Sequence, residues 1–449
     1  MSRKKPVPDL IRDGHRFSEK DVRQLTLVNA AAVANRKRLC LLVAVFNSAK
    51  VRGGTALRIL IVGAGIGGLT AALALLRDGH EVEVYEQAPQ LAELGAGVQI
   101  SANGARVLFA LGLGDAIRAV WCEPAGKEIR LWNTGETWKL FDLGAESVAR
   151  YGAPYFMIHR ADLHGVLADA VRALKPDTIR LDARCVGFED DGGRVTLHLA
   201  NGARVAGDAI VGADGVHSRI RNILAGDDKA EFTGCMAWRG LVAAAKLPPH
   251  MRRHVGVNWV GPGGHVINYF LRGGEIFNFV GIVERDWRVE SWTEKGSRED
   301  CAADFAGWHE DIHAIIRNIE QPYKWALLGR TPLTRFSRGR VTLLGDAAHP
   351  TLPMLAQGAN MAIEDGMVLA RCVAACDAIE TAFAHYDAAR VERTARLVRG
   401  ANEAARRFHN PALANADGAR AYVDAEWSEA RTKQRYDWIF EYDATRSAV

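Results

Sequence analysis

The segment "LRILIVGAGIGGLTAALALLRDGHEVEVYEQA" (residues 57–88) decides the fold of this chain. It reads as an apolar strand, a glycine-rich turn, an amphipathic helix and a second strand, which predicts a βαβ unit. Gly63, Gly65 and Gly68 form the pattern G-x-G-x-x-G. Gly63 permits the tight turn, Gly65 lets the backbone approach a pyrophosphate, and Gly68 brings the helix close to the strand. The N–H groups and the dipole at the start of the helix then favour phosphate.

Glu86 ends the second strand of this unit, 23 residues after Gly63. A carboxylate there can accept hydrogen bonds from both ribose hydroxyls and disfavours a 2′-phosphate. The segment therefore predicts an adenine dinucleotide with a free ribose. It does not decide between FAD and NAD.

Two further stretches have a strand followed by a helix start. "AIVGADGVHSRIR" (209–221) runs from an apolar strand into Asp214 and Gly215, and on its own it would be an ordinary strand–turn–helix. In "RVTLLGDAAHPTLPMLAQGANMAIED" (340–365), a strand over 341–344 ends in Gly345 and Asp346, and a helix is expected to begin near Gly358.

These motifs together resemble the flavoprotein aromatic hydroxylases, the single-component FAD monooxygenases, over roughly residues 57–400. The salicylate-hydroxylase-like branch is the most similar. The stretches that carry the resemblance are GAGIGG (63–68), GAGVQISANGARVL (95–108), HRADLHGVL (159–167), GADGVHSRIR (212–221), MAWRGLV (236–242) and GDAAHPTLPMLAQGANMAIED (345–365).

The resemblance implies an α/β fold. A Rossmann-like FAD-binding domain of the para-hydroxybenzoate hydroxylase type would be interleaved with a β-sheet substrate domain and followed by C-terminal helices. The expected parts are a poorly ordered extension (1–57), the FAD-binding domain (58–127, 151–228 and 327–376), the substrate domain (128–150 and 229–326) and a C-terminal helical segment (377–449).

The resemblance also implies roles around FAD. Asp346 would bind ribityl or ribose hydroxyls, Arg160 would reach the phosphate or ribose region, and Gln99 would lie along the ribityl chain. Asp214 would support the flavin and the place where the nicotinamide coenzyme reacts. The helix N-terminus at 356–360 would face the pyrimidine end of the flavin and stabilise negative charge on reduction. The full set of expected FAD residues is Gly63, Gly65, Gly68, Glu86, Gln99, Arg160, Asp214, Gly215, Gly345, Asp346, Gly358, Ala359 and Asn360.

The implied reaction is an NAD(P)H-dependent monooxygenation. NADH or NADPH would reduce FAD, O2 would add as a flavin C4a-hydroperoxide, and one oxygen atom would enter a salicylate-like or hydroxybenzoate-like acid or phenol, with or without decarboxylation. The chain has one G-x-G-x-x-G, which fits a coenzyme that binds transiently. The alternatives are an FAD-dependent epoxidase or a non-oxygenating FAD oxidoreductase on the same scaffold, and, outside catalysis, a flavin-bound sensor.

The substrate pocket is expected on the alternating strands between 229 and 330 and beside the loop at 353–354. The candidates for substrate contact are Cys235, Trp238 and Arg239, and those for catalysis are His265, Tyr269, Pro353 and Met354. Trp238 and Tyr269 could equally be sheet core, and His265 a hairpin residue. Relatives often carry His or Tyr near position 354. With Met354 here, the base would be His265, Tyr269 or water, or an amino group would activate the substrate.

Asp346 and His349 lie three residues apart and could suggest a metal pair or an acid–base pair. No HxH or second carboxylate cluster accompanies them in this stretch, so no metal site is expected. G-x-S-x-G is also absent, which disfavours a hydrolase. We therefore expect His349 to be structural.

Composition narrows the cellular context of the 449-residue chain. Its net charge of +4 arises in the extension, so a nucleic-acid partner has no support elsewhere. The longest early apolar run, "LCLLVAVF" (39–46), is too short to span a bilayer. Seven scattered cysteines without CxxC indicate a reducing, cytoplasmic chain. We expect a monomer or homodimer whose C-terminal aromatic residues dock onto the body of the protein or onto another subunit.

Overall fold

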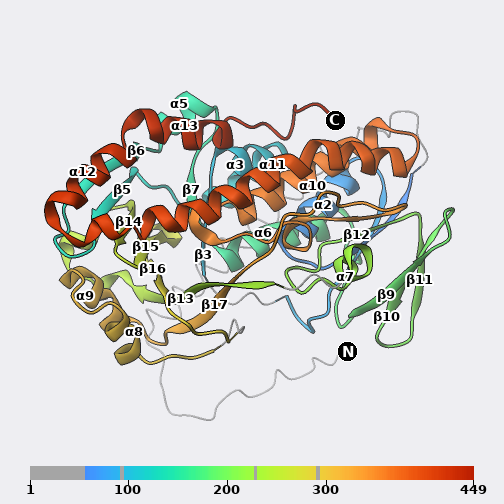
Figure 1. Cartoon of the computed structure of the whole chain (residues 1–449). Helices are drawn as coiled ribbons and strands as arrows, with labels where there is room; N and C mark the ends of the chain where they lie inside the picture. Colours follow the sequence, from blue (N-terminus) through green and yellow to red (C-terminus); the bar gives the residue numbers. More distant parts are fainter. Residues whose placement is uncertain (1–55, 92–95, 227–229, 290–293) are drawn as a thin grey trace, which may run out of the picture. The chain divides into compact units, whose positions relative to one another are not determined.

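The computed structural model describes residues 56–91, 96–226, 230–289 and 294–449. The predicted extension, 1–57, lies outside these ranges except for its last two residues. The described chain contains parallel and antiparallel sheets with helices packed against them (Figure 1). The predicted α/β fold class is confirmed.

A five-stranded sheet contains the predicted βαβ unit, and each of its strand pairs is parallel. β1 is "RILIV", buried at four of its five positions, as expected for a strand covered on both faces. In spatial order the strands are β18 (Val341–Leu343), β12 (Ala209–Gly212), β1 (Arg58–Val62), β2 (Glu81–Tyr85) and β8 (Ile179–Arg180).

Three helices pack together beside this sheet. α2 (Ile66–Arg77) contacts both α6 (Arg160–Leu174) and α10 (Gly358–Ala375). α10 begins at Gly358, which confirms the expected helix start. The long helix α11 (Ile379–Phe408) runs beside α10 (Figure 1). This packing brings the N-termini of α2 and α10 to the same region of the molecule.

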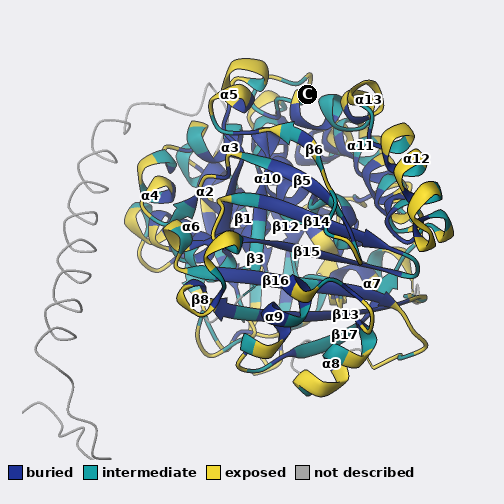
Figure 2. Ribbon diagram, turned by 90° about the vertical axis from the view of Figure 1, so that its left-hand side faces the viewer, coloured by how far each residue is buried: buried dark blue, intermediate teal, exposed yellow. Residues whose placement is uncertain are grey.

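The second large sheet has seven strands and is antiparallel except for the β14–β5 pair. β15 is buried at every position (Figure 2). Val266 and Phe270 on one of its faces belong to the same core cluster as residues of α9 (Glu310–Asn318), and Ile267 and Tyr269 on the other face line a cavity. In spatial order the strands are β17 (Tyr323–Gly329), β13 (Glu231–Ala243), β16 (Ile276–Glu284), β15 (Gly264–Leu271), β14 (Val255–Gly261), β5 (Gly126–Leu131) and β6 (Thr137–Asp142).

Short elements connect these layers. Two three-stranded sheets consist of β3 (Gly97–Ile100), β7 (Phe156–His159) and β4 (Trp121–Cys122), and of β11 (Arg204–Gly207), β10 (Val195–Leu199) and β9 (Cys185–Asp190). The remaining helices before α11 are α3 (Ala102–Ala110), α4 (Gly114–Arg118), α5 (Ala145–Tyr151), α7 (Arg219–Ala225), α8 (Arg298–Asp304) and α9 (Glu310–Asn318). The predicted domain boundaries stay a prediction.

The C-terminal segment ends in two helices, α12 (Ala416–Glu426) and α13 (Glu429–Phe440). The chain leaves helical geometry between them, at 427–428. The aromatic residues pack onto the body as predicted. Tyr436 meets Phe141 and Phe440 meets Tyr151, each with ring centroids 5.5 Å apart.

Candidate functional site

A cavity of about 330 Å³ lies where the N-termini of α2 and α10 approach the seven-stranded sheet. Twelve of the residues singled out from the sequence line it. They are Gly65, Gly68, Gln99, Arg160, Gly215, Arg239, Tyr269, Gly345, Asp346, Pro353, Gly358 and Ala359. Segments from seven separate parts of the chain therefore converge on one site.

The glycine loop before α2 has the backbone geometry that the motif predicts. Gly63 has φ +103°, and a Cβ there would lie 2.3 Å from the carbonyl oxygen of Ala213. A Cβ on Gly68 would lie 2.1 Å from the carbonyl oxygen of Gly63. Gly65 differs, because a Cβ on it would meet nothing within 4 Å. The open space beside Gly65 belongs to the cavity, and α2 has no side-chain cap and no acid in its first turn, so the loop fits the pyrophosphate of FAD.

Glu86 fixes the end of β2 to this loop. Its carboxylate accepts hydrogen bonds from the backbone N–H groups of Ala64 at 2.8 Å and Ala88 at 2.9 Å. Gly63 and Glu86 border the loop without lining the cavity. The role of Glu86 toward a ribose stays a prediction.

Asp346 lies on a short 3₁₀ turn, Gly345–Ala347, that directly follows β18. Gly345 has φ +62°, and its N–H donates to the carboxylate of Asp365 at 3.0 Å. This hydrogen bond ties the turn to α10. The Asp346 side chain is exposed and lines the cavity. The arrangement suits a carboxylate that accepts hydroxyl hydrogen bonds from a bound cofactor.

The N-terminus of α10 provides backbone donors on the other side of the cavity. Its first turn has no acidic residue and no side-chain cap, and Gly358 and Ala359 line the cavity. Asn360 is fully buried and lies behind them. Its amide accepts from Ser101 N–H at 3.1 Å and donates to the Gln99 carbonyl at 3.0 Å. The Asn360 side chain therefore holds α10 against β3, and the contact of its backbone with the cofactor stays a prediction.

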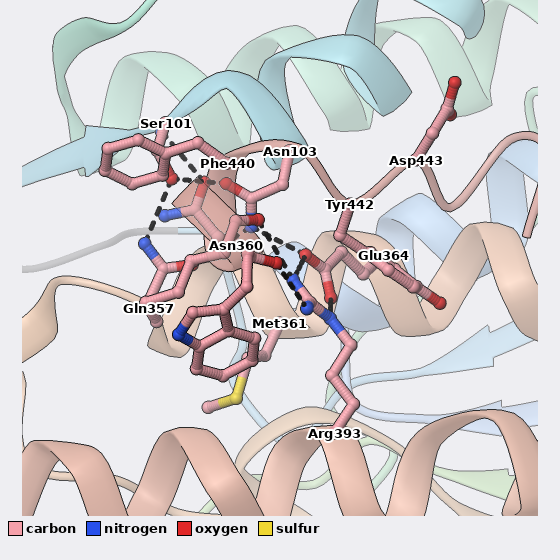
Figure 3. A network of polar contacts seen from close by, with 12 residues as sticks. Ser101, Asn103, Gln357, Asn360, Met361, Glu364, Arg393, Phe440, Tyr442 and Asp443 are labelled. Atoms are coloured by element: carbon pink, nitrogen blue, oxygen red, sulfur yellow. Dashed lines mark hydrogen bonds and ion pairs between the residues drawn. The ribbon is translucent and has the colours of Figure 1, made fainter. Parts of the chain in front are cut away.

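A chain of buried polar contacts extends from α10 to the C-terminal segment (Figure 3). Asn103 donates to Gln357 at 3.0 Å and to Glu364 at 2.6 Å. Arg393 donates to Glu364 at 2.8 Å and to the carbonyl of Ile439 at 3.2 Å. Gln357 directly precedes α10, so the end of the chain is coupled to the cofactor side of the cavity through the side chains of Asn103, Glu364 and Arg393.

A second buried group supports the turn that carries Asp346. Arg390 donates to Asp365 at 2.7 Å, and His349 lies 2.6 Å from the same carboxylate. Burial raises the pKa of Asp365, but His349 and Arg390 together bring it down to about 2. His349 is buried and does not line the cavity, in agreement with the structural role expected from the sequence.

Asp214 does not line the cavity either. It accepts from Ser218 Oγ at 2.5 Å and from Arg219 N–H at 2.7 Å, and so ties down the start of α7. Burial raises the pKa of Asp214, and these hydrogen bonds oppose the rise. Its neighbour Gly215 lines the cavity, so Asp214 shapes the loop that presents Gly215.

The seven-stranded sheet provides the aromatic wall of the cavity. Ile267 and Tyr269 point to the same face of β15 and line the cavity, as does Trp325 of β17. Arg239 lines the cavity and lies over the rings of Tyr323 and Trp325, at 5.5 and 5.3 Å. Burial raises the pKa of Tyr269, so its phenol stays protonated at neutral pH.

Behind Gln99 lies a group of polar side chains that the sequence did not indicate. Gln99 Oε1 accepts from Lys127 Nζ at 2.9 Å and from the Tyr155 hydroxyl at 2.6 Å. Gly97 lets Tyr269 approach, because a Cβ on Gly97 would lie 2.5 Å from the Tyr269 ring. The amide side chain of Gln99 is thus fixed on one side by the sheet and on the other by a lysine and a phenol.

Four candidates for the substrate pocket lie elsewhere. Cys235 lines a separate cavity of about 590 Å³. Trp238 donates to Asp304 at 2.7 Å within the core, which supports the alternative that it is sheet core. His265 is buried, with Nδ1 2.7 Å from His409 Nε2, and Met354 is buried beside the lining residue Pro353. Alternation along the strand could not separate His265 from Tyr269, because both point to the same face and only position along β15 distinguishes them.

Comparisons with known proteins agree with this site. A family model described as "FAD binding domain" matches residues 56–401. The chain belongs to this FAD-binding family. The flavoprotein is 40% identical to 3-amino-4-hydroxybenzoate 2-monooxygenase of Streptomyces platensis, over 86% of this chain and 96% of the relative. It is 35% identical to 3-hydroxybenzoate 6-hydroxylase of Polaromonas naphthalenivorans, over the same shares of the two chains. A solved structure of a salicylate hydroxylase substrate complex matches with a TM-score of 0.71 and 26% identity, over 87% of this chain and 96% of that one. The resemblance to flavoprotein aromatic hydroxylases is confirmed.

Two further observations concern the described part of this flavoprotein. It contains no group of three or more His, Cys, Asp or Glu side chains that could hold a metal ion. None of the helices described there is long and apolar enough to cross a membrane. The oligomeric state and the cellular location stay predictions.

Proposed function

We propose that this protein inserts one atom of O2 into the ring of a hydroxylated aromatic carboxylic acid, with FAD as bound cofactor and NADH or NADPH as electron donor. The observation that carries the proposal is the composition of the cavity wall. One part offers a glycine loop and two helix N-termini, and the other offers Arg239, Tyr269 and Trp325 on a sheet. The first part suits an anionic dinucleotide and the second suits a flat aromatic acid.

The names of the similar proteins support the substrate class. 3-Amino-4-hydroxybenzoate, 3-hydroxybenzoate and salicylate each join a hydroxyl and a carboxylate to one aromatic ring. In this chain, Arg239 is the charged side chain on the aromatic wall that could face such a carboxylate.

FAD, when bound, supplies the chemistry that passes two electrons from the nicotinamide coenzyme to oxygen. The residues of this chain position it and exclude water. The glycine loop and Asp346 would hold its phosphate and hydroxyl groups, and Gly358 and Ala359 would direct N–H groups toward the ring where negative charge develops. Tyr269 stays protonated, so it would donate a hydrogen bond to the substrate rather than accept its proton. His265 lies outside the cavity, so the substrate would bind as its phenolate or be activated by an amino group.

The proposal is tested with the FAD-loaded protein and a panel of salicylate, 3-hydroxybenzoate, 4-hydroxybenzoate and 3-amino-4-hydroxybenzoate. We expect at least one of these to accelerate NADH or NADPH consumption and to yield a product with one added oxygen atom. If NADH or NADPH oxidation yields only hydrogen peroxide with every compound, the proposal is wrong. NADH and NADPH assayed side by side identify the coenzyme.

A further inference from the structure

Lys127 is a buried lysine on β5 that makes no ion pair within the described chain. Its side chain is almost fully shielded from solvent. Its ammonium donates to Gln99 Oε1 at 2.9 Å and lies 5.9 and 5.7 Å from the rings of Phe141 and Tyr155. Glu128, the next residue on the strand, is held instead by Arg130 at 2.8 Å and Arg253 at 2.6 Å. An amide oxygen and two aromatic rings are therefore the polar surroundings of this amine.

An unpaired ammonium in this position is unfavourable for folding. Taking a charge out of water is costly unless an opposite charge accompanies it. Burial lowers the pKa of Lys127 to about 8, so the amine still carries its charge at neutral pH. A charge that the protein does not neutralise with its own residues is suited to an anion that arrives from outside.

Lys127 reaches the cavity through Gln99. The Oε1 atom of Gln99 accepts from both Lys127 and Tyr155, so the amide NH2 group is left for the other side, toward Tyr269. A hydrogen bond with Gln99 offsets part of the burial-induced rise in the pKa of Tyr269, as expected when the phenol oxygen accepts it. The Tyr269 proton is then available to an acceptor in the cavity. Lys127 thus fixes the direction of the Gln99 amide, and both Gln99 and Tyr269 line the cavity.

The charge of Lys127 also adds to a positive lining. The charged side chains that line the cavity are Arg160, Arg239 and Asp346. Lys127 lies one side chain behind this wall, in surroundings where water and salt screen it little.

We propose that Lys127 determines specificity: its buried charge, relayed through Gln99 and Tyr269, selects aromatic substrates that carry a carboxylate over uncharged analogues of the same shape. This inference rests on the proposed function and names the group that enforces its substrate class. Lys127 acts through Gln99 and Tyr269 and does not touch the substrate.

The test compares ligands that differ only in charge. FAD-loaded wild type, Lys127→Met and Lys127→Gln are titrated at neutral pH with 3-amino-4-hydroxybenzoate and its carboxamide, and with salicylate and salicylamide. Binding is followed by the change in flavin absorbance. For wild type we expect about tenfold or greater preference for the carboxylates. Lys127→Met should lose most of that preference, with the flavin affinity unchanged.

Two further variants separate the effect of the Lys127 charge from the effect of its hydrogen bond and from the effect of replacing any lysine on this sheet. Lys127→Gln can still donate to Gln99 but has no charge, so it should behave as Lys127→Met; restored preference in Lys127→Gln would overturn the role of charge. Lys139→Met, at an exposed lysine on the neighbouring strand β6, should leave the preference as in wild type.

Further outcomes also decide the inference. Equal binding of carboxylates and carboxamides by wild type, or an unchanged preference in Lys127→Met, would overturn it. So would a lowered flavin reduction potential in Lys127→Met with the preference intact, because the charge would then act on the flavin. Loss of preference in Lys127→Met without any oxygenated product from wild type would support charge selection and contradict the proposed function. Charge selection by Lys127 and the proposed oxygenation can therefore be disproved independently of each other.

Discussion

The two parts of the cavity wall treat buried charge in opposite ways. On the cofactor side, the buried acids Glu364 and Asp365 are paired with Arg390 and Arg393. On the sheet side, the buried cation Lys127 has an amide oxygen and aromatic rings, and no acid, as its partners among the described residues. On the cofactor side the buried charges are neutralised by the protein's own residues. On the sheet side the charge of Lys127 has no counter-charge from the described residues until an anion binds.

This difference follows from what each side has to do. A cofactor that stays bound is best held by backbone donors fixed in advance, and the buried ion pairs behind α10 fix them. A substrate that enters and leaves is selected by charge that it alone compensates. Substitutions on the cofactor side should therefore reduce cofactor binding and stability, and substitutions on the sheet side should change selectivity.

The largest effect is expected for Asp346→Ala. It removes the carboxylate that faces the cavity, and with it about two charge-assisted hydrogen bonds to FAD, which corresponds to an affinity loss of about a hundredfold or more. The purified variant should be largely colourless, and titration with FAD measures the loss. Asp377→Ala, at an exposed site between α10 and α11, is the control. A yellow, fully loaded Asp346→Ala protein would show that the assigned role is wrong.

Arg393→Met should be the next most damaging change. It leaves Glu364 with Arg390 as its remaining basic partner and releases the C-terminal segment, at an expected cost of about 3 kcal/mol in the free energy of unfolding. Urea unfolding of the FAD-loaded protein measures this cost, and FAD affinity should fall as well. Arg399→Met breaks an exposed ion pair with Glu392 and should change stability little. Equal effects of the two substitutions would contradict the coupling drawn in Figure 3.

Lys127→Met should act in the opposite direction and stabilise the protein. The pKa of Lys127 is lowered from 10.5 to about 8, so the folded state disfavours the charged amine by about 3 kcal/mol. Loss of the hydrogen bond to Gln99 offsets about 1 kcal/mol, which leaves a gain of about 2 kcal/mol at neutral pH. Urea unfolding at pH 7, with Lys139→Met alongside, measures this gain.

The lowered pKa of Lys127 also sets the direction in which the free energy of unfolding changes with pH. Between about pH 8 and 10.5 the unfolded chain keeps the proton on Lys127 that the folded chain has lost, so wild-type stability gains from this group as pH rises. The titratable side chain near the amine is the phenol of Tyr155, whose ring lies 5.7 Å away and whose pKa burial raises, so it stays protonated across this window. The difference in unfolding free energy between wild type and Lys127→Met should shrink across this window. A constant difference would mean that folding does not lower the pKa of Lys127.

The smallest effect is expected for Gly97→Ala. The added Cβ would lie 2.5 Å from the Tyr269 ring and must displace it. We expect kcat/KM to fall by about tenfold, which corresponds to about 1.4 kcal/mol, while FAD stays bound. Gly165→Ala on α6, where a Cβ meets nothing within 4 Å, is the matched control. Unchanged kcat/KM in Gly97→Ala would remove Tyr269 from the set of substrate contacts.

The cofactor side and the sheet side of the cavity also differ in how well the sequence predicts them. The cofactor side depends on local backbone geometry, and glycines at fixed spacing specify that geometry, so Gly65, Gly345 and Asp346 could be assigned to the cavity. Asn360 and Asp214 lie in the right motifs, but their side chains bond to the protein. That could not be predicted, because it depends on how β3 and α7 pack.

The sheet side depends on contacts between distant strands. Arg239 and Tyr269 could be named as candidates on these strands, but the sequence could not show that His265 lies outside the cavity. Nothing in "GKEIRL" (126–131) distinguishes Lys127 from an exposed lysine, because its burial comes from Tyr155 and Phe141 packing over it. The signal that could have found it is the pairing of β5 with β14, which needs the tertiary fold.

The most direct test of the account is the fate of labelled oxygen. The FAD-loaded protein is supplied with ¹⁸O₂, the nicotinamide coenzyme and the hydroxybenzoate that accelerates coenzyme consumption most. We expect one ¹⁸O atom in each product molecule and one coenzyme oxidised per product formed. Product without ¹⁸O, or labelled hydrogen peroxide in place of labelled product, would contradict an aromatic monooxygenase.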